Sequence, residues 1–377
     1  MVDATAMPPD RGGVGRYLEA VLPELAELPD LDVTIVVQPR DLEPVGRLVT
    51  AARVVPAPAL TARRPLRLLW EQVGLPLRAA RADVLLCPHY TMPQLGAVPR
   101  VVTLHDATFF SHPALHSRLK AVFFRTATRL AVRRAARLVV PSRATQREVE
   151  RFAGARSDMF VVALHGVDPT VFHPVTQEEK DRVRRSLGIE GRRYVAFLGT
   201  LEPRKNVPAL VRAWVAAVEG SEDPPALVLA GARGWDSEVD AAVAAVPPRL
   251  TVVRPGYVPL EDLAGLLGGA DVVAYPSLGE GFGLPVLEAM ACGAPVLTSR
   301  ELSLSEVGGD AVAYTGTSAA EIGEQLAALL VDPARRAALS VAALERAGAF
   351  TWRASAASHA AALRAAARQR PERSTAR

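Results

Sequence analysis

The sequence predicts two doubly wound α/β domains, each a parallel sheet with helices on both faces. The chain has 377 residues, which exceeds what one ordinary hydrophobic core holds. Apolar residues make up 49% and charged residues 22%, as is typical of a globular protein with large cores. Short, nearly continuous apolar runs alternate with helical patterns, and such runs are typical of parallel strands buried on both faces.

The candidate strands fall into two sets. Those of the first half are the runs at 32–37, 82–87, 100–104, 137–140 and 159–164. Those of the second half are the runs at 193–199, 226–231, 250–253, 270–276 and 294–299. Only "VDATA" precedes the first glycine loop, which is short for the central strand of such a sheet. We therefore expect either a truncated first strand or a chain that starts further upstream.

The stretch "HGVDPTVFHPVTQEE" separates the two sets, because Pro169 and Pro174 interrupt the pattern before a helix near Gln177. The predicted domains are residues 1–172 and 173–350. A helical segment, 351–377, closes the chain, and we expect its basic end to be disordered. Ligands of open parallel sheets lie beyond the carboxyl ends of the strands, so two such sheets facing each other would form a binding cleft.

Composition excludes several classes of protein. No apolar run approaches the roughly 18 residues of a membrane span, and the N-terminus shows no export signal. Cys87 and Cys292 cannot form a disulfide framework and have no metal-site spacing, so a reducing cytoplasm is the expected location. The net charge of +4 does not identify a partner.

Residues 107–147 contain nine Lys or Arg and no Asp or Glu. Leucine, valine and phenylalanine recur between these cations at helical spacing, for example Leu119, Val122 and Phe123. Such a basic amphipathic stretch suits an anionic membrane surface or an anionic substrate. A solvated helix face is the equally weighted alternative. Nucleic acid is less favoured, since no known binding motif accompanies the charge.

The loop "DRGGVGRY" lies between the first strand and a helix. Gly12, Gly13 and Gly15 allow backbone amides to approach an anion at a helix N-terminus, where the helix dipole favours negative charge. The loop is neither G-x-G-x-x-G nor a P-loop, which disfavours the usual dinucleotide and P-loop ligands. Glycine chosen for turn geometry alone is the alternative.

Charged residues follow two further strands. His105 and Asp106 end the run "TLHD", where side chains point beyond the strand. In "FLGTLEPRKN", Arg204 and Lys205 are adjacent cations close to Gly199. A diphosphate is bound well by a planar guanidinium and a compact ammonium together. A structural histidine and a solvated helix entry are the respective alternatives.

The stretch "PSLGEGFGLPVLEAMACGAPVL" carries Glu280 in a glycine loop and Glu288 on the helix that follows. The glycines allow close approach to a ligand, and a proline is typical of a helix start. Amides near Gly283 and Leu284 would then face a phosphate. The two carboxylates could flank one diphosphate ligand, although a glutamate near a helix start also satisfies the helix dipole.

Together these motifs resemble the retaining glycosyltransferases of family four, which have the GT-B fold. Glu280 and Glu288 match the family's E-x7-E pair, and "GTLEPRKN" resembles its diphosphate loop. "HGVD" and "FHP" resemble its interdomain connector, "PGYV" (255–258) its nucleobase edge, and "FTW" (350–352) the start of a helix that packs back on the first domain. The resemblance spans nearly the whole chain, and its order and spacing are specific.

The resemblance implies a role for each matched position. Arg204 and Lys205 would bind the diphosphate of the donor, and Glu288 would bind the ribose hydroxyls. Glu280 would hold the donor sugar, helped by amides at Gly281, Phe282, Gly283 and Leu284. His105 would contact the sugar near its anomeric centre, the backbone near Val258 would read the base, and Gly15 and Gly199 would border the donor. The acceptor side would comprise Gly12, Gly13, Arg16 and Asp106.

Such enzymes need no metal or other cofactor, because cations and helix N-termini replace it. Asp30-Leu31-Asp32 has the letters of a metal-binding D-x-D, but it falls in a turn and is discounted. The implied mechanism is attack on the same face of the sugar, in which the leaving phosphate accepts the acceptor's proton. Glu280 is then a positioning group and an electrostatic stabiliser.

The likeness to bacterial O-antigen and polysaccharide mannosyltransferases points to transfer of mannose from GDP-mannose to a lipid-linked or growing glycan. A UDP-hexose donor is the alternative, followed by a sugar-nucleotide epimerase and a non-catalytic nucleotide-sugar-binding module. The expected partners are therefore a nucleotide sugar and a glycan or lipid-linked acceptor, with the inner face of the membrane contacted through residues 107–147.

Overall fold

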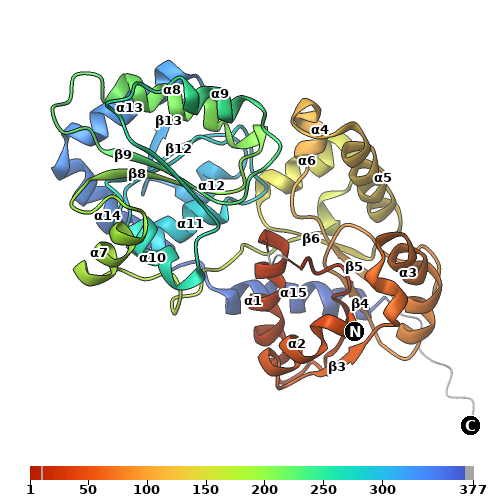
Figure 1. Ribbon diagram of the computed structural model, residues 1–377. Helices are drawn as coiled ribbons and strands as arrows, with labels where there is room; N and C mark the ends of the chain where they lie inside the picture. The colour runs from red at the N-terminus through yellow and green to blue at the C-terminus, as the bar shows by residue number, and fades with distance from the viewer. Residues whose placement is uncertain (10–11, 370–377) are drawn as a thin grey trace, which may run out of the picture. The chain divides into compact units, whose positions relative to one another are not determined.

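Both halves of the chain are parallel sheets flanked by helices in the computed structural model, which describes residues 1–9 and 12–369 (Figure 1). One compact unit comprises Met1–Gly166 and the segment that begins at Thr351; the other is Val167–Phe350. The first two residues of the "DRGGVGRY" loop and the basic end of the chain, 370–377, lie outside the described residues. The predicted fold class, two doubly wound α/β domains, is confirmed.

The sheet of the first unit has, within the described residues, seven parallel strands in the order β3-β2-β1-β4-β5-β6-β7. These strands are β1 (Val2–Asp3), β2 (Thr34–Val37), β3 (Arg53–Pro56), β4 (Leu85–Cys87), β5 (Arg100–Thr103), β6 (Arg137–Val140) and β7 (Phe160–Val162). The helices are α1 (Gly13–Ala26), α2 (Leu42–Leu48), α3 (Arg64–Ala79), α4 (Thr108–Ser111), α5 (Arg118–Arg134), α6 (Arg143–Ala153) and α15 (Trp352–Ala367).

Strand β1 is short, as the sequence predicts, yet it lies in the middle of the sheet. Val2 pairs with Ile35 on one side and Leu86 on the other. The ladder continues past both ends of the strand, because Leu86 N donates to Met1 O and Ala4 N donates to Val36 O. Two flanking residues thus supply the hydrogen bonds that a longer strand would make.

Helix α15 belongs to the first unit although it ends the chain. Its Ala356, Ala360 and Leu363 are buried in one core with the apolar face of α1. Gly166 lies so close to this helix that a Cβ there would be 2.2 Å from Trp352 N. The next residue already belongs to the second unit, since Val167 N donates to Phe350 O. The boundary is therefore at Gly166 and not at 172 as predicted, because the following residues pack into the second core.

The second unit has a sheet of six parallel strands, in the order β10-β9-β8-β11-β12-β13, within the described residues. The strands are β8 (Tyr194–Leu198), β9 (Ala226–Ala230), β10 (Val252–Gly256), β11 (Val272–Tyr275), β12 (Val296–Ser299) and β13 (Ala313–Thr315). The helices are α7 (Gln177–Ser186), α8 (Val207–Ala217), α9 (Glu238–Ala244), α10 (Leu260–Gly268), α11 (Leu284–Ala291), α12 (Leu304–Gly308), α13 (Ala319–Val331) and α14 (Pro333–Ala347).

Helices cover both faces of this second sheet. Helices α8, α9 and α13 pack on one another at one face, and α7, α10, α11 and α14 do so at the other (Figure 1). Strands β8, β9 and β11 are wholly buried, which explains their continuous apolar sequences. The indole of Trp214 is also buried, and its Nε1 donates to Pro225 O at 3.1 Å. Because helices cover both faces of the sheet, a site can form only at the ends of the strands, where the loops lie.

Two other expectations from composition concern the cysteines and membrane spans. Cys87 and Cys292 are buried and unpaired with each other. Among the described residues, no helix combines the length and the apolar character needed to cross a bilayer.

Candidate active site

The loops after β8 and β11 lie side by side at the point where the strand order reverses. The chain passes from β8 to β9 and β10, then returns to place β11 on the other side of β8. At such a switch point the chain continues from the two neighbouring strands to opposite faces of the sheet. This leaves room for a ligand beyond the carboxyl ends of the strands. Arg204 and Lys205 are on the first loop and Glu280 is on the second. The fold therefore brings together residues that are far apart in the sequence.

Glu280 bridges both cations of the first loop. Its Oε1 accepts from Lys205 Nζ at 2.7 Å, and its other oxygen pairs with the Arg204 guanidinium. Oε1 also accepts from Ser277 Oγ at 2.6 Å and Tyr275 Oη at 3.0 Å. On the other side, Arg204 donates to Glu202 Oε1 at 2.6 Å. The cluster thus holds two cations and two carboxylates in direct contact.

The charges of this cluster are stabilised by one another. Burial alone would raise the pKa of Glu280, but Arg204 and Lys205 outweigh it and lower the pKa to about 2. Burial, with the neighbouring Arg204, lowers the pKa of Lys205, while Glu280 and Glu202 oppose that shift. Lys205 Nζ also lies 5.0 Å from the centre of the Tyr275 ring. Glu280 therefore stays ionised near neutral pH and is held directly against both cations.

Hydrogen bonds from side chains to backbone carbonyls fix the two loops relative to each other. Asn206 has a positive φ of 59°, and its side-chain amide donates to Thr317 O at 2.8 Å and Pro276 O at 3.3 Å. The hydroxyl hydrogen of Ser277, which the Glu280 carboxylate accepts, is shared with Arg204 O at 3.0 Å. Ser303 Oγ donates to Glu280 O at 2.7 Å and to Phe282 O at 2.9 Å. The cluster therefore has a rigid supporting frame, which sequence reasoning did not identify.

Helix α11 starts directly after the Glu280 loop. Gly283 is its N-cap with φ of 101°, a conformation that favours glycine, and Pro285 occupies the first turn. The predicted positions Gly281, Phe282 and Leu284 adjoin this start. Glu288 is 3% exposed on the same helix. Burial raises the pKa of the Cys292 thiol, and the negative charge of Glu288 raises it further. Of the four charged residues predicted for the donor, three are in direct contact and Glu288 lies further along α11.

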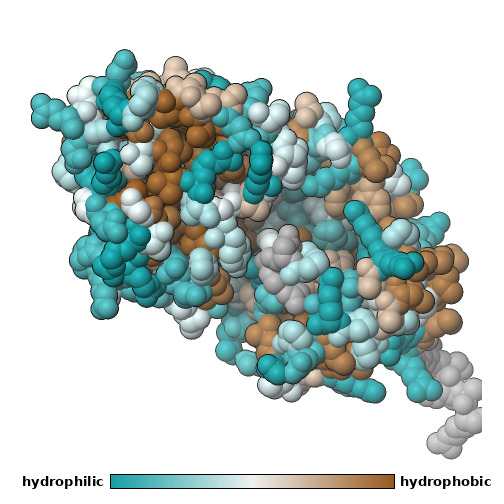
Figure 2. All heavy atoms as spheres, viewed as in Figure 1, coloured by the Kyte–Doolittle hydropathy of each residue, from teal (hydrophilic) through white to brown (hydrophobic). Residues whose placement is uncertain are grey.

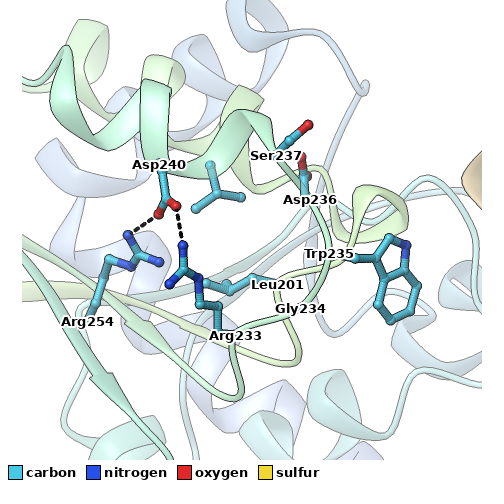
Figure 3. Close-up of a pocket in the computed structure, with 9 residues that line it drawn as sticks. Leu201, Arg233, Gly234, Trp235, Asp236, Ser237, Asp240 and Arg254 are labelled. Atoms are coloured by element: carbon cyan, nitrogen blue, oxygen red, sulfur yellow. Dashed lines mark hydrogen bonds and ion pairs between the residues drawn. The ribbon is translucent and has the colours of Figure 1, made fainter.

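Two adjoining pockets, of about 300 and 430 Å³, lie beyond the ends of β8, β9 and β10. Both are lined by Leu201, Arg233, Asp240 and Arg254. Asp240 accepts from Arg233 at 2.8 Å and from Arg254 at 2.6 Å, and Trp235 points away from this trio (Figure 3). Gly256 borders the larger pocket, so the pocket reaches the predicted "PGYV" edge just before the buried Val258.

The loops of this unit approach one another so closely that glycine is required. Gly231, after β9, has φ of 131°, and a Cβ there would be 2.2 Å from Gly199 O. Gly199 opens the loop that carries Arg204 and Lys205, as predicted from the sequence. Gly231 therefore fixes the path of the predicted diphosphate loop, a role that its sequence context did not reveal.

In the first unit, the glycine loop leads into α1. Gly12 is the N-cap, Gly13 is the first residue of the helix, and Arg16 N donates to Gly12 O at 3.0 Å. Gly15 is buried against the core and Arg16 lies one position further along. The predicted strand–glycine–helix geometry is thus present at the carboxyl end of β1.

His105 and Asp106 follow β5 as predicted. His105 Nε2 lies 2.7 Å from Pro88 O, and since a carbonyl oxygen only accepts, Nε2 carries the hydrogen. Nδ1 is then the acceptor of the neutral ring. Burial lowers the pKa of His105, against the opposing effects of Pro88 O and Asp106. Thr108 Oγ1 donates to the Asp106 carboxylate at 3.3 Å.

A hydrogen-bonded chain next to His105 links α15 to the sheet. His359 Nδ1 lies 2.8 Å from Ser355 O and must donate to it, so Nε2 is an acceptor. Tyr17 Oη, 2.7 Å from that nitrogen, therefore donates to it and can accept from Thr103 Oγ1 at 3.3 Å. The Tyr17 ring stands edge-on to His105, with ring centres 4.9 Å apart. The neutral form of His359 is thus built into the core.

This core should make the first unit sensitive to acid. Burial lowers the pKa of His359 to about 4 from an ordinary 6.5. Between these values the unfolded chain binds the proton more readily, so stability is full above pH 6.5 and falls as pH falls towards 4. We expect a loss of roughly 2 kcal/mol from this group between pH 7 and 5. Urea denaturation of the wild type and of His359→Gln at both pH values measures it, and equal pH dependence would contradict the assignment.

Asp30, the first residue of the D-x-D letters, forms an ion pair within the first unit. Asp30 accepts two hydrogen bonds from Arg364 of α15, both at 2.6 Å. Within the described part of the chain, no three His, Cys, Asp or Glu side chains are grouped as metal ligands.

Two doubly wound units, with a basic–acidic cluster at the switch point of the second sheet, define a protein of the α/β class with the GT-B fold. Residues 11–171 match glycosyltransferase family 4, and residues 179–346 match the glycosyl transferases group 1. The chain therefore belongs to the glycosyltransferases of the family 4 and group 1 type.

Several known proteins are similar to the chain. O-antigen chain mannosyltransferase B of Escherichia coli is 30% identical over 254 residues, which are 67% of this chain and 66% of that protein. D-inositol 3-phosphate glycosyltransferase of Arthrobacter sp. (strain FB24) is 35% identical over 59% of this chain and 54% of its own. The chain thus spans between half and two thirds of the curated relatives it matches.

Solved structures share the fold at low sequence identity. HepE of Anabaena, in complex with UDP-glucose, has a TM-score of 0.75 at 19% identity, covering 96% of this chain and 98% of that one. WaaG, a glycosyltransferase involved in lipopolysaccharide biosynthesis, has a TM-score of 0.71 at 17% identity, covering 93% and 96%.

Sequence reasoning missed the residues that support the charged cluster. Tyr275, Ser277 and Ser303 are polar groups buried around Glu280. Tyr275 ends β11 and Ser277 follows it closely, but nothing in the sequence alone shows that they face Glu280. Glu202 could have been noticed as an acid two residues before two adjacent cations.

Proposed function

We propose that the protein is a retaining glycosyltransferase that moves a hexose from a nucleotide sugar to a lipid-linked or growing glycan. The observation that carries this proposal is the Arg204–Lys205–Glu280 cluster at the switch point of the second sheet. A buried arginine and lysine on one loop match the two phosphates of a nucleoside diphosphate. The adjoining pockets beyond β9 and β10 offer space for the nucleoside.

Donor binding would exchange the partners of the two cations. Without ligand, the carboxylates of Glu280 and Glu202 neutralise Arg204 and Lys205. An incoming diphosphate carries more charge than a carboxylate and can replace Glu280 on the cations. Glu280 would then accept hydrogen bonds from the donor sugar, close to its retained partner Ser277. The exchange couples diphosphate binding to placement of the sugar.

The chemistry of transfer would rest on charge stabilisation. Arg204 and Lys205 stabilise the negative charge that develops on the leaving diphosphate, so that no metal is required for this task. The acceptor hydroxyl attacks the anomeric carbon from the face that the phosphate leaves, and a phosphate oxygen takes the proton. Glu280 positions the sugar and stabilises the positive charge that develops on its ring. The configuration at the anomeric carbon is retained.

The first unit would supply the acceptor side and part of the donor contacts. Gly12, Gly13 and Arg16 at the start of α1, with Asp106, would contact the acceptor. His105, in its neutral Nε2–H form, would present Nδ1 as an acceptor to a sugar hydroxyl. Gly15 would border the donor. Glu288 on α11 would bind the ribose.

GDP-mannose is the proposed donor. The similar mannosyltransferase of Escherichia coli supports mannose as the sugar. The Asp240 carboxylate lines the pocket and pairs with Arg233 and Arg254. Its remaining lone pairs could accept the two adjacent N–H donors of guanine, which favours a guanine base. A UDP-hexose is the second candidate, favoured by the likeness in fold to HepE, which was crystallised with UDP-glucose. We further propose action at the inner face of the cytoplasmic membrane, contacted through residues 107–147.

A panel of nucleotide sugars tests the donor directly. A ligand that binds only the folded protein at 100 times its Kd adds about 2.7 kcal/mol of stability, or roughly 5–10 °C in Tm for a unit of this size. We expect the largest shift with GDP-mannose and a smaller shift with UDP-glucose. Lys205→Met should abolish the shift and serves as the control.

Transfer separates the remaining alternatives. A glycosyltransferase releases the nucleoside diphosphate only when a sugar hydroxyl or water accepts the hexose. A binding module would show the thermal shift without release, and an epimerase would return an intact nucleotide sugar with inverted configuration. With a donor that stabilises the protein, an inverted nucleotide sugar would refute the proposal. So would the absence of release when lipid-linked and glycan acceptors are supplied.

A further inference from the structure

Helices α3 and α5 enclose an apolar groove on the first unit. The groove has a volume of about 480 Å³. One wall is a single face of α5 at helical spacing, made of Leu119, Val122, Phe123, Thr126 and Leu130. Leu68 and Gln72 of α3 line the other side, and Met92 also contributes to the lining. A groove of this size is within the range of small-molecule sites, and apolar side chains form the larger part of its lining, as is usual for such sites.

The groove is surrounded by exposed apolar side chains. Leu119 is 82% exposed and Val122 is 61% exposed at the groove itself. Four further side chains form a stripe on α3 at spacings of three and four residues: Leu66, Leu69, Val73 and Leu77. Figure 2 shows the hydrophobic atoms gathered over α3. Large exposed apolar patches of this kind mark interaction sites in soluble units.

Cations, and no exposed acids, border the groove on its two helices. Arg64, at the start of α3, places its guanidinium 5.3 Å from the centre of the Phe123 ring, across the groove on α5. Arg118 and Lys120 are exposed in the first turn of α5. The acid of the lining, Glu71, is buried and already accepts from Arg67 at 3.1 Å and from Thr91 at 2.6 Å. The rim therefore suits a phosphate and the walls suit a hydrocarbon.

We propose that this groove binds the hydrocarbon chain of a lipid-phosphate-linked acceptor, with the phosphate between Arg64 and the first turn of α5. This inference rests on the proposed function, because it names the chemistry of the acceptor. A second copy of the chain is a poorer occupant, since two such faces would bring like charges together. A flat bilayer surface would cover the stripe on α3 and leave the concave groove empty.

The probe that tests the site is farnesyl phosphate with a photoreactive diazirine at the end of its chain. It is used below the concentration at which the probe aggregates. We expect crosslinks to the α3 and α5 residues of the groove, mapped by mass spectrometry. Val122→Glu, which places a carboxylate at an exposed position of the wall, should weaken probe binding at least about tenfold. Val331→Glu alters a side chain that is 80% exposed in the second unit and should have no effect.

The outcomes separate this inference from its alternatives. Crosslinks elsewhere, or unchanged binding by Val122→Glu, would overturn it. Bilayer docking would give a different pattern, which would also overturn the inference. The wild type would not bind the monomeric probe, and Val122→Glu would lose binding to phosphatidylglycerol vesicles. A change from dimer to monomer with unchanged probe binding would indicate an interface between copies. The thermal shift with nucleotide sugars is independent of the groove, so failure of the proposed function would be seen separately.

Discussion

Replacing Glu280 by glutamine should lower kcat by about 10²–10³-fold while the nucleoside diphosphate binds as tightly as before, or more tightly. The reason is the double role of this carboxylate. It is the counter-ion of Arg204 and Lys205 in the free protein and, in the proposed mechanism, the group that holds the donor sugar. Glutamine keeps the shape and an oxygen acceptor but loses the charge. The two cations then bind a diphosphate without a competing anion.

Initial rates and calorimetric titration of the diphosphate measure the two halves of this prediction. Glutamine is preferable to alanine, because it fills the same space and keeps an oxygen acceptor for Ser277 and Tyr275, so that no cavity is added to the loss of charge. Asp271→Asn is a matched control. Asp271 pairs with Arg193 at 2.5 Å and precedes β11, at the opposite end of the strand that leads to Glu280. A kcat for Glu280→Gln equal to that of the control would rule out the proposed role.

Replacing Gly231 by alanine should destabilise the second unit by roughly 3 kcal/mol and abolish donor binding. The added Cβ would lie 2.2 Å from Gly199 O, and the backbone φ of 131° disfavours any L side chain. The close neighbour is backbone, so it can yield only if the loop that carries Arg204 and Lys205 moves. Stability and the phosphate site should therefore fail together.

Urea denaturation and the GDP-mannose thermal shift test this coupling. Gly220→Ala is the control, because a Cβ at Gly220 meets no atom within 4 Å and its backbone needs no left-handed conformation. We expect the control to change stability by less than about 1 kcal/mol and to keep the thermal shift. Wild-type donor binding by a destabilised Gly231→Ala protein would show that the loop position does not depend on this contact.

Much of the fold followed from apolar runs, because a strand buried on both faces has to be continuously apolar. Strands β8, β9 and β11 were predicted for this reason, and so was the glycine–helix start of α1. Strands β3 and β13 were missed. β3 is partly exposed at the sheet edge and β13 has three residues, so neither presents a long apolar run.

The candidate site was predictable in part for a similar reason. Charged residues directly after buried strands have no place in a core, so Arg204, Lys205, His105 and Glu280 could be assigned to strand ends. Their partners could not be assigned. Tyr275, Ser277 and Ser303 are ordinary residues in the sequence. They become hydrogen-bond partners of Glu280 only because β8, β11 and the loop after β12 lie next to one another.

The sequence by itself determined the class of this protein: two α/β units, a pair of cations and a pair of acids at strand ends. Only the tertiary structure decided that Glu280 neutralises both cations, that Gly231 holds their loop, and that α3 and α5 leave a groove. The physical reason is that local pattern reports burial and backbone conformation one segment at a time. Charge pairing, close backbone approach and unfilled space depend on which segments the strand order places side by side.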